Sequence, residues 1–368
     1  MKLELTKEDK KKLKELIEIK DNNIAIANML NYFFDEIGYF YFNDLISVKN
    51  ELALKTINDA IFILMMEALE IDLDEIETKR VVDDYIHKEL KEDNLNFYLN
   101  NEYYKAIKPN PIKKSNYELT YLKFEPFQLF PKDEINLKTN FKEITPLGYF
   151  TSQFSYLALL QNDVVWMSIT PNEINTMKPF IEEMKGVIAV FGLGLGYIPF
   201  MLSLKKDVKK IIIIENNKDI INIFKDNILI YFSFEQKEKV EIKYIDAFVF
   251  LKENATHFDF MFFDLWHNPN DGISSYIKIL KYEEKYKTTT FRYWLEPSLL
   301  ALARRCLLTL FKENTLDYKI EKYIKAQNIT DKIINRMYFL LKDKTFNKIE
   351  EIMDILSNEN IKDLLKKL

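Results

Sequence analysis

The stretch Val187–Glu215 constrains the fold of this chain more than any other part of it. It reads VIAVFGLGLGYIPFMLSLKKDVKKIIIIE. A short apolar run, rich in β-branched residues, precedes three closely spaced glycines, a segment with helical spacing, and a second apolar run that ends on an acid. Such short apolar runs are typical of strands buried in a parallel sheet. The stretch therefore predicts a right-handed βαβ unit with a glycine turn after its first strand.

The glycine turn and the acid after the second strand predict a nucleotide site. Gly192, Gly194 and Gly196 let the backbone bend sharply and let a ligand approach it closely. N–H groups at the start of the next helix favour polar or anionic ligand groups. Glu215 can accept hydrogen bonds from both hydroxyl groups of a ribose. A tight turn that binds no ligand is the alternative interpretation.

The glycine spacing does not fit the dinucleotide fingerprint G-x-G-x-x-G. The third glycine would fall at Tyr197 when counted from Gly192, and at Pro199 when counted from Gly194. The observed pattern is G-x-G-x-G instead. Because the chain has only 7 glycines, three within one turn do not reflect a glycine-rich composition.

Two more acids follow predicted strands in the same way. Asp246 comes directly after the predicted third strand, Val240–Ile245, and Asp264 comes directly after the predicted fourth strand, Phe258–Phe263. Open α/β sheets bind ligands at the carboxyl ends of their strands. We therefore expect an α/β fold with a doubly wound parallel sheet, in which the glycine turn and these acids meet at one edge.

Length, charge and cysteine content exclude several classes of protein. At 368 residues, the chain is long enough for two or three globular units. Its net charge of −5 does not favour sequence-independent binding to nucleic acid. The single cysteine, Cys306, excludes an intrachain disulfide and fits a reducing, cytoplasmic location. We expect neither a secretory signal in the charged stretch Met1–Leu16 nor a segment that spans a membrane.

The pattern of the chain changes three times along its length. A helical region comes first, with Thr6 as the cap of its first helix, and a small β-rich element follows. Within this element Tyr117–Phe124 alternates as a strand does, and Gln161-Asn162-Asp163 suits a hairpin turn. Both helical ends of the chain are candidate surfaces for partners or for self-association. The four predicted segments are residues 1–108 (helical), 109–169 (β-rich), 170–312 (nucleotide unit) and 313–368 (helical).

The first helix of the nucleotide unit is expected to begin at Pro171. Thr170 can cap this helix, Pro171 suits its first position, and Glu173 can close a capping box. In a functional interpretation, the same helix start also faces the cofactor. Both interpretations can hold together.

The middle of the chain resembles the class I S-adenosylmethionine (SAM) dependent methyltransferases. The resemblance rests on the G-x-G-x-G turn, on Glu215, and on Asp246-Ala247-Phe248 after the third strand. Within that superfamily the chain is similar to the spermidine synthase-like (aminopropyltransferase) branch, which also has a small β element before the nucleotide unit. The resemblance implies a Rossmann-like sheet and SAM as cofactor, and it leaves both helical ends unaccounted for.

The resemblance also implies a role for each residue of the cofactor site. The three glycines would pass under the amino-acid part of SAM, and Glu215 would hold the ribose hydroxyls. Asp246 would accept from the adenine N6 amine, and Ala247 would present its backbone N–H to the ring. An ionised carboxylate suits these roles because it only accepts hydrogen bonds. The alternative for Asp246 is a cap for the helix that starts near Phe248.

The loop Asp264-Leu265-Trp266-His267 is expected at the acceptor site. Asp264 can orient or deprotonate a nucleophile, and His267 can act as a base because its unperturbed pKa lies near neutrality. Trp266 can form an aromatic wall for a cation. The alternatives are a polar loop with a packed tryptophan and a solvated histidine, or a metal site through Asp264, His267 and Asp271. We assign no metal.

Tyr293, Trp294 and Glu296 are expected to line the same pocket from its far side. Aromatic rings beside an acid suit an amine or another cationic acceptor. In the alternative interpretation, Trp294 belongs to the core and Glu296 is an acid in the first turn of a helix.

Two departures from known motifs leave the acceptor open. Aminopropyltransferases carry an Asp-Ser-Ser-Asp type motif where this chain has Asp264-Leu265-Trp266-His267. DNA and RNA amine methyltransferases often carry Asn/Asp-Pro-Pro-aromatic there, which this chain lacks. We expect a SAM-dependent methyltransferase acting on a small molecule or a protein. The alternatives are an aminopropyltransferase-like enzyme that uses decarboxylated SAM, and a non-catalytic scaffold that keeps the nucleotide fold.

Overall fold

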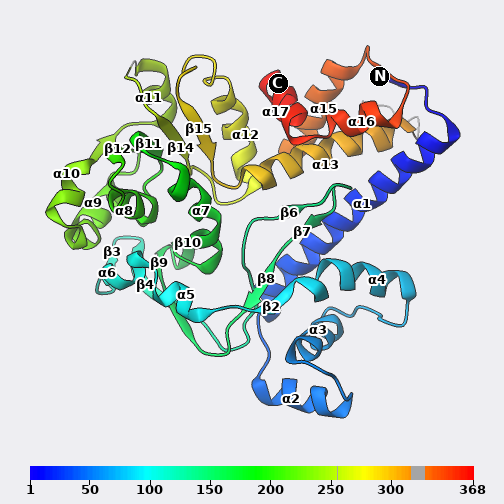
Figure 1. Cartoon of the computed structure of the whole chain (residues 1–368), viewed down its shortest axis with the longest axis horizontal. Coiled ribbons are helices and arrows are strands. Elements are labelled where there is room, and N and C mark those ends of the chain that lie inside the picture. Colours follow the sequence, from blue (N-terminus) through cyan, green and yellow to red (C-terminus); the bar gives the residue numbers. More distant parts are fainter. Residues whose placement is uncertain (255, 316–327) are drawn as a thin grey trace.

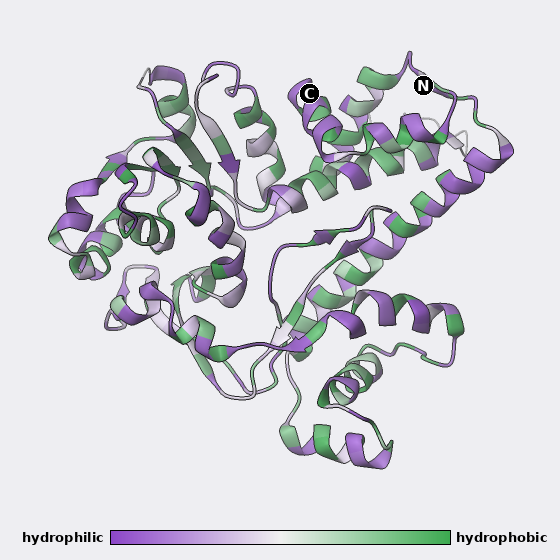
Figure 2. Ribbon diagram, viewed as in Figure 1, coloured by the Kyte–Doolittle hydropathy of each residue, from purple (hydrophilic) through white to green (hydrophobic). Residues whose placement is uncertain are grey.

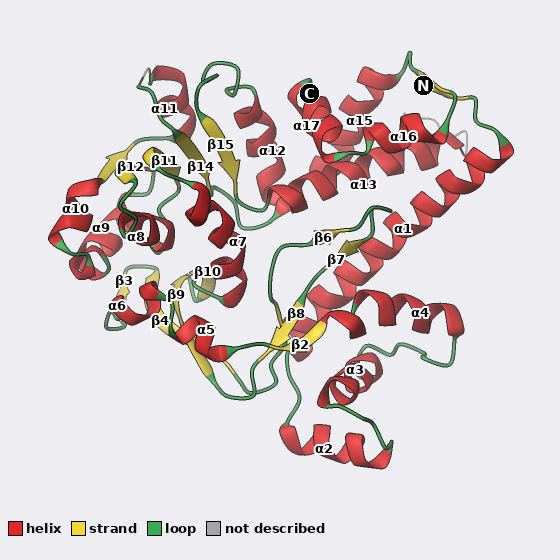
Figure 3. Cartoon of the chain, in the orientation of Figure 1, coloured by secondary structure: helices red, strands yellow, loops and turns green. Residues whose placement is uncertain are grey.

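The computed structural model describes residues 1–254, 256–315 and 328–368, and it confirms the predicted α/β class (Figures 1 and 3). In the view of Figure 1, a parallel sheet and its helices lie on the left. The N-terminal helices, in blue, lie at the lower right, and the C-terminal helices, in orange and red, lie at the upper right. None of the described helices is long and apolar enough to cross a membrane.

Five parallel strands form the main sheet, in the order β13-β12-β11-β14-β15. The middle strand, β11, pairs on both sides, so that Val190 lies opposite Ile213 on one neighbour and Phe262 on the other. These side chains are β-branched or aromatic and buried, as in strands covered on both faces. Each predicted apolar run is confirmed as a strand. The strands are β11 (Gly186–Phe191), β12 (Val208–Glu215), β13 (Val240–Tyr244), β14 (Phe260–Phe263) and β15 (Thr290–Tyr293).

Helices connect these strands, and polar side chains cap several of them. Thr170, Asn217 and Asn268 each accept a hydrogen bond from backbone N–H groups of the helix that follows. A short 3₁₀ turn, Leu229–Tyr231, lies between the two helices that connect β12 to β13. The helices are α7 (Pro171–Glu183), α8 (Tyr197–Ser203), α9 (Lys218–Asn227), α10 (Phe234–Lys239), α11 (Ala247–Glu253), α12 (Pro269–Leu280) and α13 (Glu296–Thr315).

An antiparallel sheet with the order β10-β9-β4-β3 precedes the parallel sheet in the chain. Its strand β4 covers the predicted span Tyr117–Phe124. Asn162 and Asp163 have φ values of 53° and 63°, which are the left-handed values of a tight hairpin turn and confirm the predicted one. The strands are β3 (Ile112–Lys114), β4, β9 (Phe154–Gln161) and β10 (Val164–Ser168). Shorter strands nearby are β5 (Phe130–Pro131), β6 (Asn136–Leu137), β7 (Glu143–Ile144) and β8 (Leu147–Tyr149).

The N-terminal helices pack around a second hydrophobic core. Thr6 caps the first helix as predicted, because its Oγ1 accepts from the Asp9 N–H. Hydrophobic and hydrophilic residues alternate along this helix (Figure 2), and Phe33, at its end, is fully buried in the second core. The expected helical pattern is wrong at β2 (Leu90–Glu92), which pairs with β8. The helices are α1 (Lys7–Tyr32), α2 (Phe42–Glu51), α3 (Ile57–Ala68), α4 (Ile76–Tyr85), α5 (Leu95–Leu99) and α6 (Glu102–Ala106), with a π-helical turn at Phe33–Ile37 and a 3₁₀ turn at His87–Glu89.

The two ends of the chain lie together. Strand β1 (Lys2–Leu3) pairs in parallel with β16 (Thr345–Phe346), so that Leu3 lies opposite Phe346. The predicted C-terminal extension is mostly helical where it is described, but the prediction is wrong at β16, and residues 316–327 lie outside the described residues. The sequence pattern predicts the two ends as separate segments and does not indicate this pairing. The remaining helices are α15 (Ile329–Leu341), α16 (Ile349–Ile355) and α17 (Asn358–Lys366).

Candidate functional site

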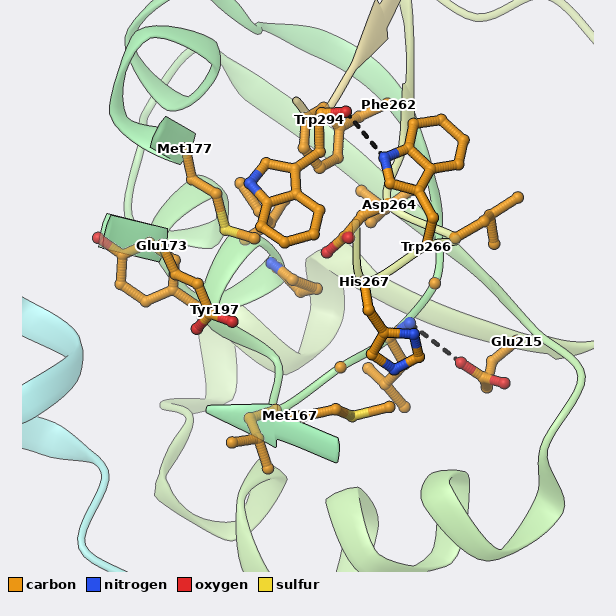
Figure 4. A pocket seen from close by; sticks show the side chains of 18 of the residues that line it. Met167, Glu173, Met177, Tyr197, Glu215, Phe262, Asp264, Trp266, His267 and Trp294 are labelled. Carbon is orange, nitrogen blue, oxygen red and sulfur yellow. Dashed lines mark hydrogen bonds between the residues drawn. The ribbon is translucent and has the colours of Figure 1, made fainter. Parts of the chain in front are cut away.

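Residues at the carboxyl ends of the parallel strands enclose a cavity of about 530 Å³. Glu215 ends β12, Asp246 follows β13, Asp264 follows β14, and Trp294 follows β15. Residues of α7 and β10 line the other side, and Figure 4 shows side chains from both sides around one space. Pockets of about 300–1,000 Å³ are usual for small ligands.

The three glycines of the turn have different surroundings. All three have positive φ, with 93° at Gly192, 53° at Gly194 and 74° at Gly196, where glycine is favoured. A Cβ at Gly192 would lie 2.0 Å from the Asp264 carbonyl oxygen, and one at Gly196 would lie 2.3 Å from the Phe224 ring. At Gly194 it would meet nothing within 4 Å. Gly192 and Gly194 line the cavity, whereas Gly196 is not among its lining residues and permits close packing against α9.

Glu215 connects the end of β12 to the glycine turn. Its Oε2 accepts from the Leu193 N–H at 3.1 Å, and its Oε1 accepts from the Asn217 N–H at 2.7 Å. The side chain is 9% exposed and lines the cavity. Because a carboxylate oxygen can accept more than one hydrogen bond, both oxygens keep capacity for donors of a ligand.

Asp246 caps α11, as one of its two interpretations predicted. Its Oδ1 accepts from the N–H groups of Phe248 and Val249, at 2.9 and 3.1 Å. The cap uses neither the second oxygen of Asp246 nor the N–H of Ala247, which is the first residue of the helix. Asp246 and Ala247 both line the cavity. The cap and the predicted adenine site are therefore compatible.

Asp264 lies in the cavity close to the glycine turn. Burial, which disfavours the charged form, raises the pKa of this carboxyl to about 7, and the charge of Glu215 adds to the effect. A carboxyl that titrates near neutrality can accept a proton and return it in neutral solution. This property agrees with the general-base role expected for Asp264.

Glu173 is an acid of the cavity that the predicted site omitted. Its N–H donates to the capping Thr170 Oγ1 at 3.5 Å. Its carboxyl lines the cavity, and Oε2 is buried with no hydrogen-bond partner among the described residues. Burial first, and then the charge of Asp264, raise the pKa of Glu173 well above its usual value. An acid at a helix start that faces the cofactor was visible in the sequence. The capping pattern already explained an acid at this position, so Glu173 was not included in the predicted site.

Trp266 and His267 both line the cavity but differ in burial. Trp266 is 4% exposed, and its Nε1–H donates to the Trp294 carbonyl at 3.0 Å. The His267 side chain is exposed, and its Nδ1 lies 3.1 Å from Asp271 Oδ2. The packed tryptophan and solvated histidine of the alternative interpretation are thus present, in residues that border the cavity.

The three residues expected on the far side do not stay together. Trp294 borders the cavity, whereas Tyr293 and Glu296 are not among its lining residues. Tyr293 O–H donates to Glu283 at 2.8 Å, and Glu296 accepts from Lys362 of α17 at 2.8 Å. Because neighbouring residues of an extended chain point in opposite directions, Tyr293 turns away from the space that Trp294 faces. The prediction that all three line one pocket needs this correction.

The β10 hairpin supplies a wall that the sequence analysis missed. Trp166 and Met167 of β10 line the cavity together with Tyr197 of α8. The Trp166 ring stacks on Tyr117 at a centroid distance of 5.6 Å, and its centroid lies 6.4 Å from that of His267. Strand alternation predicted this hairpin, but it does not reveal which neighbour each face contacts.

The cavity carries acids but neither lysine nor arginine. Glu173, Glu215, Asp246 and Asp264 are among its lining residues, and no lysine or arginine is. The acids therefore favour a cationic ligand. Among the residues that the structure describes, no group of three or more His, Cys, Asp or Glu side chains could hold a metal ion. The alternative metal site through Asp264, His267 and Asp271 is thus not formed.

No protein-family model and no curated protein matches this chain.

Proposed function

We propose that this chain is a SAM-dependent transferase with a Rossmann-like, doubly wound sheet, and that it methylates a small-molecule or protein acceptor. The observation that carries the proposal is the meeting of the glycine turn, Glu215, Asp246 and Asp264 around one cavity. The strand order supports the fold, because it reverses between β11 and β14. Ligands of open α/β sheets bind at such a switch point.

The residues around the glycine turn fit SAM. The open space beside Gly194 gives the amino-acid part of a ligand room close to the backbone. Both oxygens of Glu215 keep capacity for ribose hydroxyls, and the second oxygen of Asp246 and the Ala247 N–H remain for an adenine edge. These residues lie at the carboxyl ends of three neighbouring strands, β11, β12 and β13.

The chemistry would be divided between the cofactor and the acid after β14. SAM, when bound, would supply an electrophilic methyl group on a positively charged sulfur. Asp264 would take the proton that the acceptor loses, because its pKa of about 7 suits that exchange. Trp266 and Trp294 would keep water from that side of the cavity. Holding both reactants in one cavity would supply much of the acceleration.

Transfer of an aminopropyl group from decarboxylated SAM is the second candidate. The absence of lysine and arginine from the lining residues favours it, because SAM has a carboxylate that decarboxylated SAM lacks. Backbone N–H groups at the glycine turn can hold a carboxylate as well, so both candidates remain.

Calorimetric titration of the full chain with SAM, decarboxylated SAM and NAD tests the proposal and separates these candidates. We expect SAM to bind more tightly than the other two. Tighter binding of decarboxylated SAM would favour the aminopropyl candidate. Binding of NAD alone would contradict both.

A further inference from the structure

The acids of the cavity differ in which of their carboxyl oxygens have a hydrogen-bond partner. Glu215 accepts backbone hydrogen bonds from Leu193 of the glycine turn and from Asn217, and Asp246 accepts two from the start of the helix that follows it. Glu173 differs, because its buried Oε2 has no partner among the described residues. Buried polar groups nearly always have a partner, so an unpaired one calls for an explanation. A ligand donor at this position would satisfy Glu173.

The surroundings of Glu173 are apolar and aromatic (Figure 4). Met177 lies one turn further along α7, and Phe262 belongs to β14. We call the group formed by Glu173, Asp264, Met177, Phe262 and Trp294 the amine subsite, and all five residues line the cavity. A charge in such walls would be poorly hydrated, so its partner must be an opposite charge.

The charges around the amine subsite determine which ligand would fit. Burial, and then the charge of Asp264, raise the pKa of Glu173 and so disfavour its ionised form. A positive charge beside Glu173 would favour that form and would give Oε2 a donor. The other two acids of the lining, Glu215 and Asp246, already accept backbone hydrogen bonds. A second positive charge would therefore face the apolar side chains of the subsite. An anionic ligand would meet no lysine or arginine among the lining residues.

We infer that the amine subsite holds the acceptor, and that this acceptor is a small amine with a single positive charge and an apolar body. Glu173 is the residue that selects for the charge, and Met177, Phe262 and Trp294 contact the apolar body. The inference rests on the proposed function, because the word acceptor presumes a donor bound at the glycine turn. Binding of an amine at the amine subsite can be tested without any bound methyl donor.

The test compares three probes on the full chain at pH 8, where Asp264 is largely ionised. The probes are 2-phenylethylamine, its neutral analogue 2-phenylethanol, and the dication 1,4-diaminobutane, each measured by calorimetry. We expect the monoamine to bind at least about tenfold more tightly than the other two, as a charge-assisted hydrogen bond would provide. Equal binding of the amine and the alcohol, or tighter binding of the diamine, would overturn the inference.

Two variants locate the effect. Glu173→Gln should remove the preference for the amine over the alcohol, because it removes the charge and keeps the shape. Glu182→Gln, on an exposed acid of the same helix, should leave the preference unchanged. An unchanged preference in Glu173→Gln would contradict the role of Glu173. If that variant does not fold, the comparison of the three probes on the unmodified chain still decides the inference.

A SAM titration of the same samples separates this inference from the proposed function. Selective amine binding without SAM binding would support the subsite and contradict the proposed function. SAM binding without amine selectivity would support the proposed function and contradict the subsite. A Mg²⁺ titration that displaces the amine would assign the acids to a metal instead, and would also overturn the inference.

Discussion

At the scale of single residues, four carboxyl groups line the cavity together with no lysine or arginine, so the cavity is acidic. Burial raises the pKa of both Glu173 and Asp264, although each lies at a position that local rules explain. Glu173 is the third residue of its helix, and Asp264 is the first residue after its strand. The sequence analysis predicted Asp264 because acids at strand ends are informative. It passed over Glu173, because a cap accounts for an acid there and burial cannot be seen from local sequence.

Asp264→Asn should stabilise the protein in alkaline solution. The pKa of this acid is raised in the folded state, so its cost to stability is absent below pH 4 and grows until about pH 7. Asparagine carries no such charge. The variant should therefore have a higher free energy of unfolding than the unmodified chain at pH 8, and this advantage should be roughly 1–3 kcal/mol larger than at pH 4. That is the range for an unsatisfied buried polar group. Urea unfolding at both pH values measures this difference.

Asp226→Asn serves as the control, because Asp226 is exposed on α9. Its free energy of unfolding should follow that of the unmodified chain at both pH values. If Asp264→Asn behaves in the same way as this control, the buried state of Asp264 in solution differs from the one described here.

At the scale of elements, the glycine turn depends on a helix far away in the sequence. Tyr103 of α6 is 1% exposed, and its O–H donates to the Leu195 carbonyl of the turn at 2.5 Å. Asn101, just before α6, donates to the Tyr197 hydroxyl at 3.0 Å. The helical pattern of residues 1–108 predicted a helix in this region, and α6 forms one. It gave no sign of these contacts, because tertiary partners are not encoded in local periodicity.

Tyr103→Phe should destabilise the glycine turn. The change keeps the packed ring and leaves the Leu195 carbonyl without its donor, at a cost of about 1–3 kcal/mol. We expect a lower free energy of unfolding and weaker binding of SAM. Tyr121→Phe is a matched control. The Tyr121 hydroxyl also donates to a backbone carbonyl, that of Pro109, but the Tyr121 side chain is 39% exposed. Equal effects of the two changes would contradict a special role for Tyr103.

At the scale of the whole molecule, the ends of the chain and its middle form one structure. Strand β1 pairs with β16, and Lys362 of α17 contacts Glu283 and Glu296 beside the parallel sheet. The sequence predicted the order of strands and helices in the middle well, because hydrophobic runs and caps are local signals. It could not predict the pairing of the ends, because Leu3 and Phe346 carry no local mark of each other.

The central claim is that the cavity binds SAM through the acid at the end of β12. Titration of the full chain with SAM, before and after Glu215→Ala, tests it most directly, with Glu241→Ala on β13 as the control outside the cavity. Glu215 also accepts two backbone hydrogen bonds, so unfolding curves must first show that the variant is folded. The account predicts tight binding that weakens by roughly 10-fold or more in Glu215→Ala alone, since a charged acceptor contributes about 1.5–3 kcal/mol. An unchanged dissociation constant in a folded variant, or no SAM binding by the unmodified chain, would contradict it.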